Sequence, residues 1–218
     1  MSSLHIADIY SALIHNEDTP NLRSPRHPLV VIFQLSFAVG VLVAYTYTAR
    51  NLGQTILFFV TIGLSLSTVA YHMWRPNRFL RFVDQTMISW FALATPVPFV
   101  YHDPYIMLLL GTLALLSVLN KWYEWEPSFE VGSIVFTCLG LISMFLLVTV
   151  GLPRIGADLL SFEAQLMYAT FVYFILKLII YHYEIGLIRK LIESPEFGHI
   201  VIMVATSHIL FLSAIRPV

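Results

Sequence analysis

Long apolar stretches, all free of Asp, Glu, Lys and Arg except for Lys177 in one of them, alternate with short polar segments along almost the whole chain of 218 residues. Each stretch is about as long as a helix must be to cross roughly 30 Å of hydrocarbon. Apolar and polar residues do not alternate with period two, which argues against a transmembrane β-barrel. The pattern predicts an all-α polytopic membrane protein, a seven-transmembrane-helix bundle. The expected helices cover residues 28–49, 51–74, 85–102, 104–120, 131–153, 164–183 and 197–215.

Composition supports this class of protein. Hydrophobic residues make up 58% of the chain and charged residues only 11%, which is too little charge to cover the surface of a water-soluble domain. The formal net charge of −1 argues against nucleic acid as a partner, and the single cysteine, Cys138, excludes a disulfide framework. We expect an integral, multi-pass membrane protein. Its single domain spans residues 28–218, preceded by a cytoplasmic or interfacial segment, residues 1–27, without the apolar core of a signal peptide.

The distribution of basic residues predicts the orientation in the membrane. One side holds eight of the twelve Lys and Arg residues and the other side holds three, while Lys177 lies inside a span. Cytoplasmic loops carry the excess of basic residues in membrane proteins. We therefore expect the N-terminus in the cytoplasm and the C-terminus outside. The eight are Arg23, Arg26, Arg75, Arg78, Arg81, Lys121, Arg189 and Lys190.

Three polar residues fall at the ends of stretches that meet on the cytoplasmic side. His72 closes the second helix, Asp84 opens the third and His199 begins the seventh. Placing a polar residue at such a depth costs free energy, so such residues usually pair with another polar group or serve a function. Imidazole and carboxylate groups at one level can bind a divalent metal, form a proton relay, or pair with arginines at the headgroup boundary.

Further polar residues share this side of the membrane. Thr68 stands four residues before His72, so its hydroxyl lies on the same helical face one turn deeper. Glu196 shares the face of His199, and His182 ends the sixth helix at a similar depth. We expect Lys177 to snorkel to the interface, with a buried ion pair as the alternative.

The local sequence around these residues resembles the signature of the CREST superfamily, which contains alkaline ceramidases, progestin and adipoQ receptors, and hemolysin III proteins. The family pattern is Ser-x-x-x-His on helix 2, Asp at the start of helix 3 and His-x-x-x-His at the start of helix 7. Residues 67–72 and 79–84 match with Thr68 at the serine position, His72 and Asp84. Residues 94–99 are similar to the end of helix 3 in hemolysin III proteins, and residues 196–211 to the last helix of alkaline ceramidases.

The chain departs from this pattern at one ligand. The second histidine of the last helix is His199, but the first position holds Pro195, which has no donor atom. The resemblance implies a zinc ion held by His72 and His199, and the third ligand is left open. Glu196 and His182 are the candidates, since Glu-x-x-His places both groups on one helical face; the site can also hold no metal. His208 is a poor substitute, because it lies nine residues further on, roughly on the opposite face.

With a metal bound, the resemblance implies a zinc-dependent hydrolase acting on a lipid amide or ester, as ceramidases do, at cytoplasmic headgroup depth. Asp84 would accept a proton from the attacking water, and Thr68 would donate a hydrogen bond to the oxyanion. Two other hypotheses stay open: a receptor-like protein that binds a membrane lipid without turnover, and a structural subunit of a membrane complex.

Overall fold

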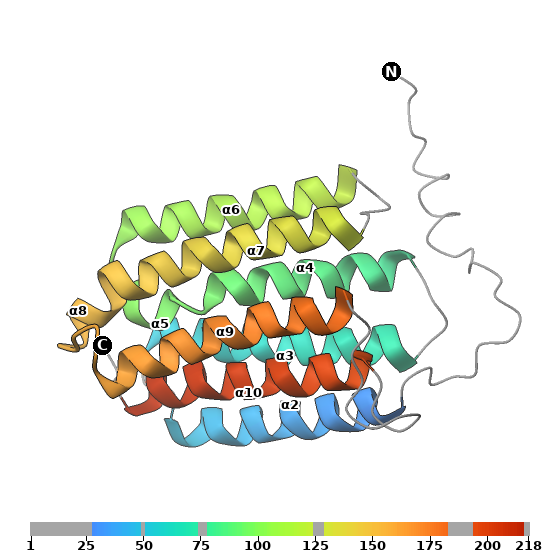
Figure 1. Ribbon diagram of the computed structural model, residues 1–218, viewed down its shortest axis with the longest axis horizontal. Coiled ribbons are helices and arrows are strands. Elements are labelled where there is room, and N and C mark those ends of the chain that lie inside the picture. Colours follow the sequence, from blue (N-terminus) through green and yellow to red (C-terminus); the bar gives the residue numbers. More distant parts are fainter. Residues whose placement is uncertain (1–27, 49–50, 74–77, 124–128, 183–193, 216–218) are drawn as a thin grey trace, which may run out of the picture.

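The computed structural model describes residues 28–48, 51–73, 78–123, 129–182 and 194–215, and every regular element in these ranges is a helix. Seven long helices lie side by side and run alternately in opposite directions (Figure 1). The predicted all-α fold is therefore confirmed, whereas the expected segment 1–27 lies outside these ranges. The long helices are α2 (Pro28–Thr48), α3 (Leu52–Met73), α4 (Arg78–Ala94), α6 (Pro104–Tyr123), α7 (Phe129–Leu146), α9 (Phe162–His182) and α10 (Ser194–Ile215).

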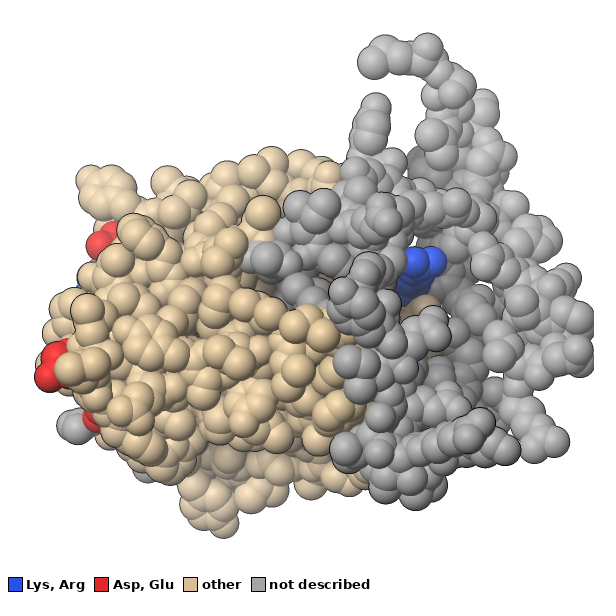
Figure 2. Space-filling view, in the orientation of Figure 1, with Lys and Arg blue, Asp and Glu red and all other residues tan. Residues whose placement is uncertain are grey.

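Four helices in the described part of the chain are long and apolar enough to cross a membrane, judged by length and composition. They are α2, α3, α6 and α10. The face of the molecule in Figure 2 shows the same character, because charged side chains appear near the two ends and not on the visible described surface between them. The fold is compatible with an integral membrane protein.

The expected helix over residues 85–102 was wrong at both ends. Helix α4 begins at Arg78 and ends at Ala94, and a short helix, α5 (Val97–Val100), follows the turn at Thr95 and Pro96. Charged residues can lie in the first turns of a helix, so the limits of a charge-free stretch are not helix limits. Proline disfavours helical geometry in the residue before it, which ends α4. Asp84 consequently lies six residues inside α4 and does not open it.

The expected helix over residues 131–153 is also interrupted. Helix α7 ends at Leu146, and the π-helical turn η1 (Leu147–Gly151) leads into the short helix α8 (Leu152–Arg154). Pro153 has no N–H to donate and its ring would clash with the carbonyl four residues earlier. The wider π turn, in which the N–H of Leu152 bonds the Leu147 carbonyl, accommodates this proline.

Side-chain caps fix where two of the helices begin. The N–H of Gln54 donates to Asn51 Oδ1 at 2.8 Å, and the Gln54 side chain accepts from the Asn51 N–H at 3.3 Å. This is a reciprocal capping arrangement. Asp103 caps α6 by accepting from the N–H groups of Tyr105 and Ile106. Helix α6 begins at Pro104, where the expected helix over residues 104–120 begins.

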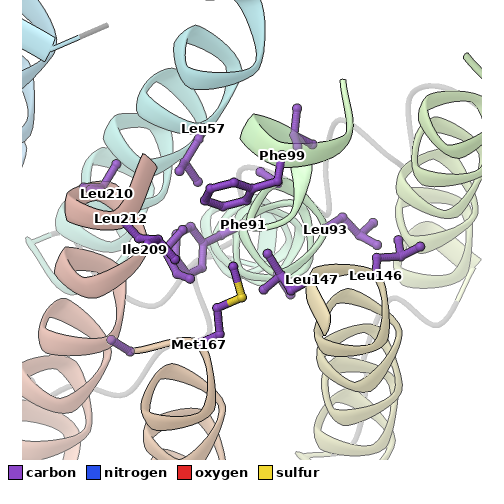
Figure 3. Close-up of a cluster of buried hydrophobic side chains, with 14 of the residues drawn as sticks. Leu57, Phe91, Leu93, Phe99, Leu146, Leu147, Met167, Ile209, Leu210 and Leu212 are labelled. Carbon is purple, nitrogen blue, oxygen red and sulfur yellow. The ribbon is translucent and has the colours of Figure 1, made fainter. Parts of the chain in front are cut away.

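Helix α4 and the segment after it form the centre of the bundle. Every residue from Phe91 to Val100 is buried, and α4 contacts α3, α6 and α7. Figure 3 shows Phe91 and Phe99 among leucine, isoleucine and methionine side chains from the surrounding helices. Gly53 of α3 allows α5 to approach closely, since a Cβ there would lie 2.9 Å from backbone atoms of Val97 and Pro98.

Candidate functional site

We call the end of the molecule where α2 begins the N-terminal end of the bundle. Helices α4, α7 and α10 also begin there, and α3, α6 and α9 end there (Figure 1). Thr68, Lys177 and His199 each lie five residues from their helix limit at this end, and Gln34 and Asp84 each lie six. With a rise of 1.5 Å per residue, each of the five lies about 8–9 Å along its own helix from that limit.

Asp84 is buried and bonded to α3. Its side chain is 5% exposed, and its Oδ1 accepts a hydrogen bond from the Thr68 hydroxyl at 2.7 Å. The Ser67 hydroxyl lies 3.5 Å from the same oxygen, a weak contact, because it also donates to the Leu64 carbonyl at 2.9 Å. Burying a carboxylate is costly unless it is hydrogen-bonded, so the Thr68–Asp84 bond offsets part of the cost of burying Asp84.

The two histidines singled out in the sequence lie next to each other. The ring centroids of His72 in α3 and His199 in α10 are 5.3 Å apart, and the rings are nearly perpendicular at 89°. Both side chains are buried, at 7% and 5% exposed. The structure thus brings together Thr68, His72, Asp84 and His199 at one end of the bundle, as the sequence led us to expect.

Gln34 of α2 is a site residue that sequence reasoning missed. Its side-chain amide lies 3.1 Å from Nδ1 of His199, and the contact fixes the orientation of that ring. As placed, the amide nitrogen donates to Nδ1; with the amide turned over, its oxygen would accept from Nδ1–H instead. The signal available in the sequence was a lone amide in the otherwise apolar stretch 28–49.

A small cavity adjoins these residues. It has a volume of about 10 Å³, which is room for about one water molecule. Its lining mixes apolar side chains of α3, α4 and α10 with four polar residues: Gln34, Thr68, Lys177 and His199. Asp84 adjoins this space through Thr68, a lining residue whose hydroxyl bonds the carboxylate.

Lys177 does not follow the sequence expectation that it snorkels to the interface. Its side chain is partly buried and lines the cavity, and it interacts electrostatically with Asp84. A lysine can point inward at this depth because a carboxylate of opposite charge offsets part of the cost of removing the ammonium from water.

Lys121 is a second inward lysine, although the sequence grouped it with the cytoplasmic basic residues. It lies near the end of α6, is 5% exposed, and donates to Ser89 Oγ at 2.8 Å and to the Gln85 carbonyl. These bonds tie α6 to α4. Lys121 is not among the residues that line the cavity.

The described residues fit a zinc site in part. His72 and His199 are two imidazoles of the type that zinc prefers. Gln34 contacts Nδ1 of His199, and only with its amide turned over would its oxygen accept from Nδ1–H, as partners of metal-bound histidines do. Within the described ranges, no group of three His, Cys, Asp or Glu side chains is close enough to hold a metal. The candidate ligands Glu196 and His182 belong to α10 and α9, but their side chains lie outside what the structure describes.

His208 is placed away from the site, in agreement with the sequence argument. Its ring packs on Tyr173 of α9 with centroids 5.5 Å apart, and it does not line the cavity.

Comparison of the chain with protein-family models, with curated proteins and with solved structures gave no match. The fold and the site together define a helical protein, with helices suited to a membrane, that buries a carboxylate, two imidazoles and a lysine at one end of its bundle. What the chain does is inferred from these residues.

Proposed function

We propose that this chain is a membrane-embedded hydrolase of the CREST type that cleaves a lipid amide or ester. In this proposal all seven long helices cross the membrane, with the N-terminus in the cytoplasm and the site at cytoplasmic headgroup depth. The four apolar helices and the alternating direction of the bundle support this arrangement. The excess of basic residues on the N-terminal side supports the orientation.

The observation that carries the proposal is the hydrogen bond from Thr68 to Asp84 beside a water-sized cavity that His199 also lines. Ionisable residues inside a membrane protein are rare and mark functional sites by default. A carboxylate joined to the cavity by a hydroxyl is suited to general base catalysis, because a proton can pass from water to the carboxylate through the hydroxyl.

The reaction proceeds in two steps in this proposal. A water in the cavity attacks the carbonyl carbon of the lipid amide; its proton passes to Thr68 as the hydroxyl proton of Thr68 passes to Asp84, and the carbonyl π electrons move onto oxygen. The C–N bond then breaks, and the leaving amine takes the proton held by Asp84. Fatty acid and amine are released, and Asp84 is again a carboxylate.

The hydrogen bond also changes the role that the family resemblance gave to Thr68. A hydroxyl has one hydrogen, and that hydrogen points to Asp84. While this bond is made, Thr68 accepts a hydrogen bond from water and does not donate one to an oxyanion.

His72 and His199 would hold a zinc ion in this proposal, with Glu196 or His182 as the third ligand. Bound zinc makes its water acidic enough to lose a proton near neutral pH. Gln34 would keep the His199 ring in a fixed orientation for this purpose.

Turnover of a panel of N-acyl lipids by the purified protein in nanodiscs, followed by mass spectrometry, tests the reaction. We expect fatty acid from wild-type protein and a loss of at least about 100-fold in Asp84→Asn, the range for removing a general base. Asp103→Asn is the matched control, because Asp103 lies at the opposite end, 3.5 Å from Arg154, and should keep the activity. Lipid binding without product in the wild type would favour a receptor-like protein.

Metal content tests the zinc site separately. We expect near-stoichiometric zinc in wild-type protein, a clear loss in His72→Ala and no change in His208→Ala, which removes a histidine outside the cavity. Protein that contains no zinc, or that keeps its zinc in His72→Ala, would rule out a zinc ion held by His72 and leave the structural-subunit hypothesis in place.

A further inference from the structure

Gln34 keeps one end of its side-chain amide free. The side chain is 3% exposed, and its amide nitrogen contacts Nδ1 of His199 at 3.1 Å. Within the described part of the chain the amide oxygen has no hydrogen-bond partner, yet it is not one of the fully enclosed atoms that lack a partner. The oxygen therefore borders space that a water molecule can reach.

The small cavity at this end of the bundle is the space that Gln34 lines. His199, which the amide contacts, lines the same cavity, so the tip of the Gln34 side chain lies at the cavity wall. The volume of about 10 Å³ admits a group about the size of one water molecule. An N–H or O–H group of a lipid suits this volume, whereas a phosphate head group is too large for it.

The free oxygen decides which kind of group binds there. An amide oxygen accepts hydrogen bonds and cannot donate them. Thr68 adds a second acceptor to the lining, because its one hydroxyl hydrogen points to Asp84. A buried acceptor that loses its water and gains no donor costs affinity. A ligand that enters the cavity therefore binds best if it brings a hydrogen-bond donor.

We propose that Gln34 is a recognition residue for a neutral lipid whose head group carries an N–H or O–H donor, which the free amide oxygen accepts. A neutral donor is favoured because a charged group loses far more hydration on entering the cavity. The consequence for substrate choice rests on the proposed hydrolase function: the same oxygen would accept the N–H of a lipid amide and favour it over an ester, which has no such donor. Lipid recognition itself does not depend on hydrolysis.

The test compares 2-heptadecanol with 2-heptadecanone, which share one carbon skeleton and contain no bond to hydrolyse. The alcohol can donate and accept a hydrogen bond, whereas the ketone can only accept. Binding to the full-length protein in detergent is measured by isothermal titration, and the ratio of the two dissociation constants is compared among variants. We expect wild-type protein to prefer the alcohol by about fivefold or more, the effect of one hydrogen bond. With the amide turned over, its NH₂ group would face the cavity and the ketone would bind at least as well, which would overturn the proposal.

Gln34→Met keeps the length of the side chain without the amide and should remove the preference; Gln34→Leu serves if the Met variant does not fold. Gln54→Met is the matched control, because Gln54 is also a buried glutamine but lies at the opposite end of the bundle; it should keep the preference. A ratio measured within one preparation is insensitive to loss of folded protein.

The proposal is also overturned if neither ligand binds, if Gln34→Met keeps the preference, or if Gln54→Met loses it equally. A normal alcohol preference in a protein that hydrolyses no lipid would disprove the hydrolase and leave Gln34 as a recognition residue. Lipid hydrolysis without the preference would do the reverse.

Discussion

The bond between Thr68 and Asp84 makes a quantitative prediction about stability. Thr68→Val removes the hydroxyl while keeping the shape of the side chain, and leaves the buried carboxylate with the weak 3.5 Å contact to Ser67 and its electrostatic interaction with Lys177. A hydrogen bond to a charged group contributes about 1.5–3 kcal/mol. Neutral polar pairs between membrane helices average only about 0.6 kcal/mol, because the unfolded chain in the membrane also finds partners. We expect Thr68→Val to cost at least about 1.5 kcal/mol.

A double-mutant cycle shows whether the Asp84 carboxylate is the reason why Thr68→Val lowers the stability. In an Asp84→Asn background the partner of Thr68 is neutral, so the cost of Thr68→Val should fall to about 1 kcal/mol or less. The free energy of unfolding is measured by reversible SDS titration in mixed micelles, with the four proteins prepared alike.

Thr86→Val is the control for replacing a buried threonine at this level. The Thr86 hydroxyl is buried and has no hydrogen-bond partner within the described part of the chain, so its removal should be neutral or stabilising. A cost for Thr68→Val no greater than that for Thr86→Val, or an equal cost in both backgrounds, would refute the idea that the hydroxyl stabilises a buried carboxylate.

Two further predictions concern a close helix contact and the His199 ring. Gly53→Ala should destabilise the fold by about 1–3 kcal/mol, because its new methyl would meet the α5 backbone at 2.9 Å. The control is Gly111→Ala, which has no atom within 4 Å of its new methyl and should be neutral or slightly stabilising. Both are measured by the same SDS titration. Gln34→Leu should weaken zinc binding by about 10–100-fold in competition with a chelator, because His199 loses its orienting partner. Gln165→Leu, at the opposite end of the bundle, should leave the zinc affinity unchanged. Equal zinc affinity in the two variants would contradict the role of Gln34 in orienting His199.

The fold could be predicted well from the spacing of apolar stretches, and its errors have local causes. A charge-free stretch marks where a helix can be buried in hydrocarbon, but backbone chemistry decides where the helix ends. Pro96 and Pro153 therefore shifted two boundaries that hydropathy alone placed incorrectly.

The site could be predicted only as far as helix ends and helix faces carry information. Those rules brought His72, Asp84 and His199 to one end of the bundle, and the spacing of four put Thr68 on the face of His72. They could not show that Gln34 meets His199 or that Lys177 turns inward, because both facts depend on how α2 and α9 are rotated against their neighbours. Rotation about a helix axis is set by packing, which a single sequence does not report.

The shared depth of the polar residues also fixes how the helices are aligned along their lengths. Leucine and isoleucine side chains pack almost equally well after one helix slides past another by a turn, about 5.4 Å, and surrounding lipid does not penalise the slip. Sliding α3 by one turn towards the N-terminal end of the bundle would place an apolar residue, Leu64, opposite Asp84 and leave the carboxylate without the Thr68 hydrogen bond. The polar contacts thus favour one axial alignment of helices whose apolar faces alone would allow several.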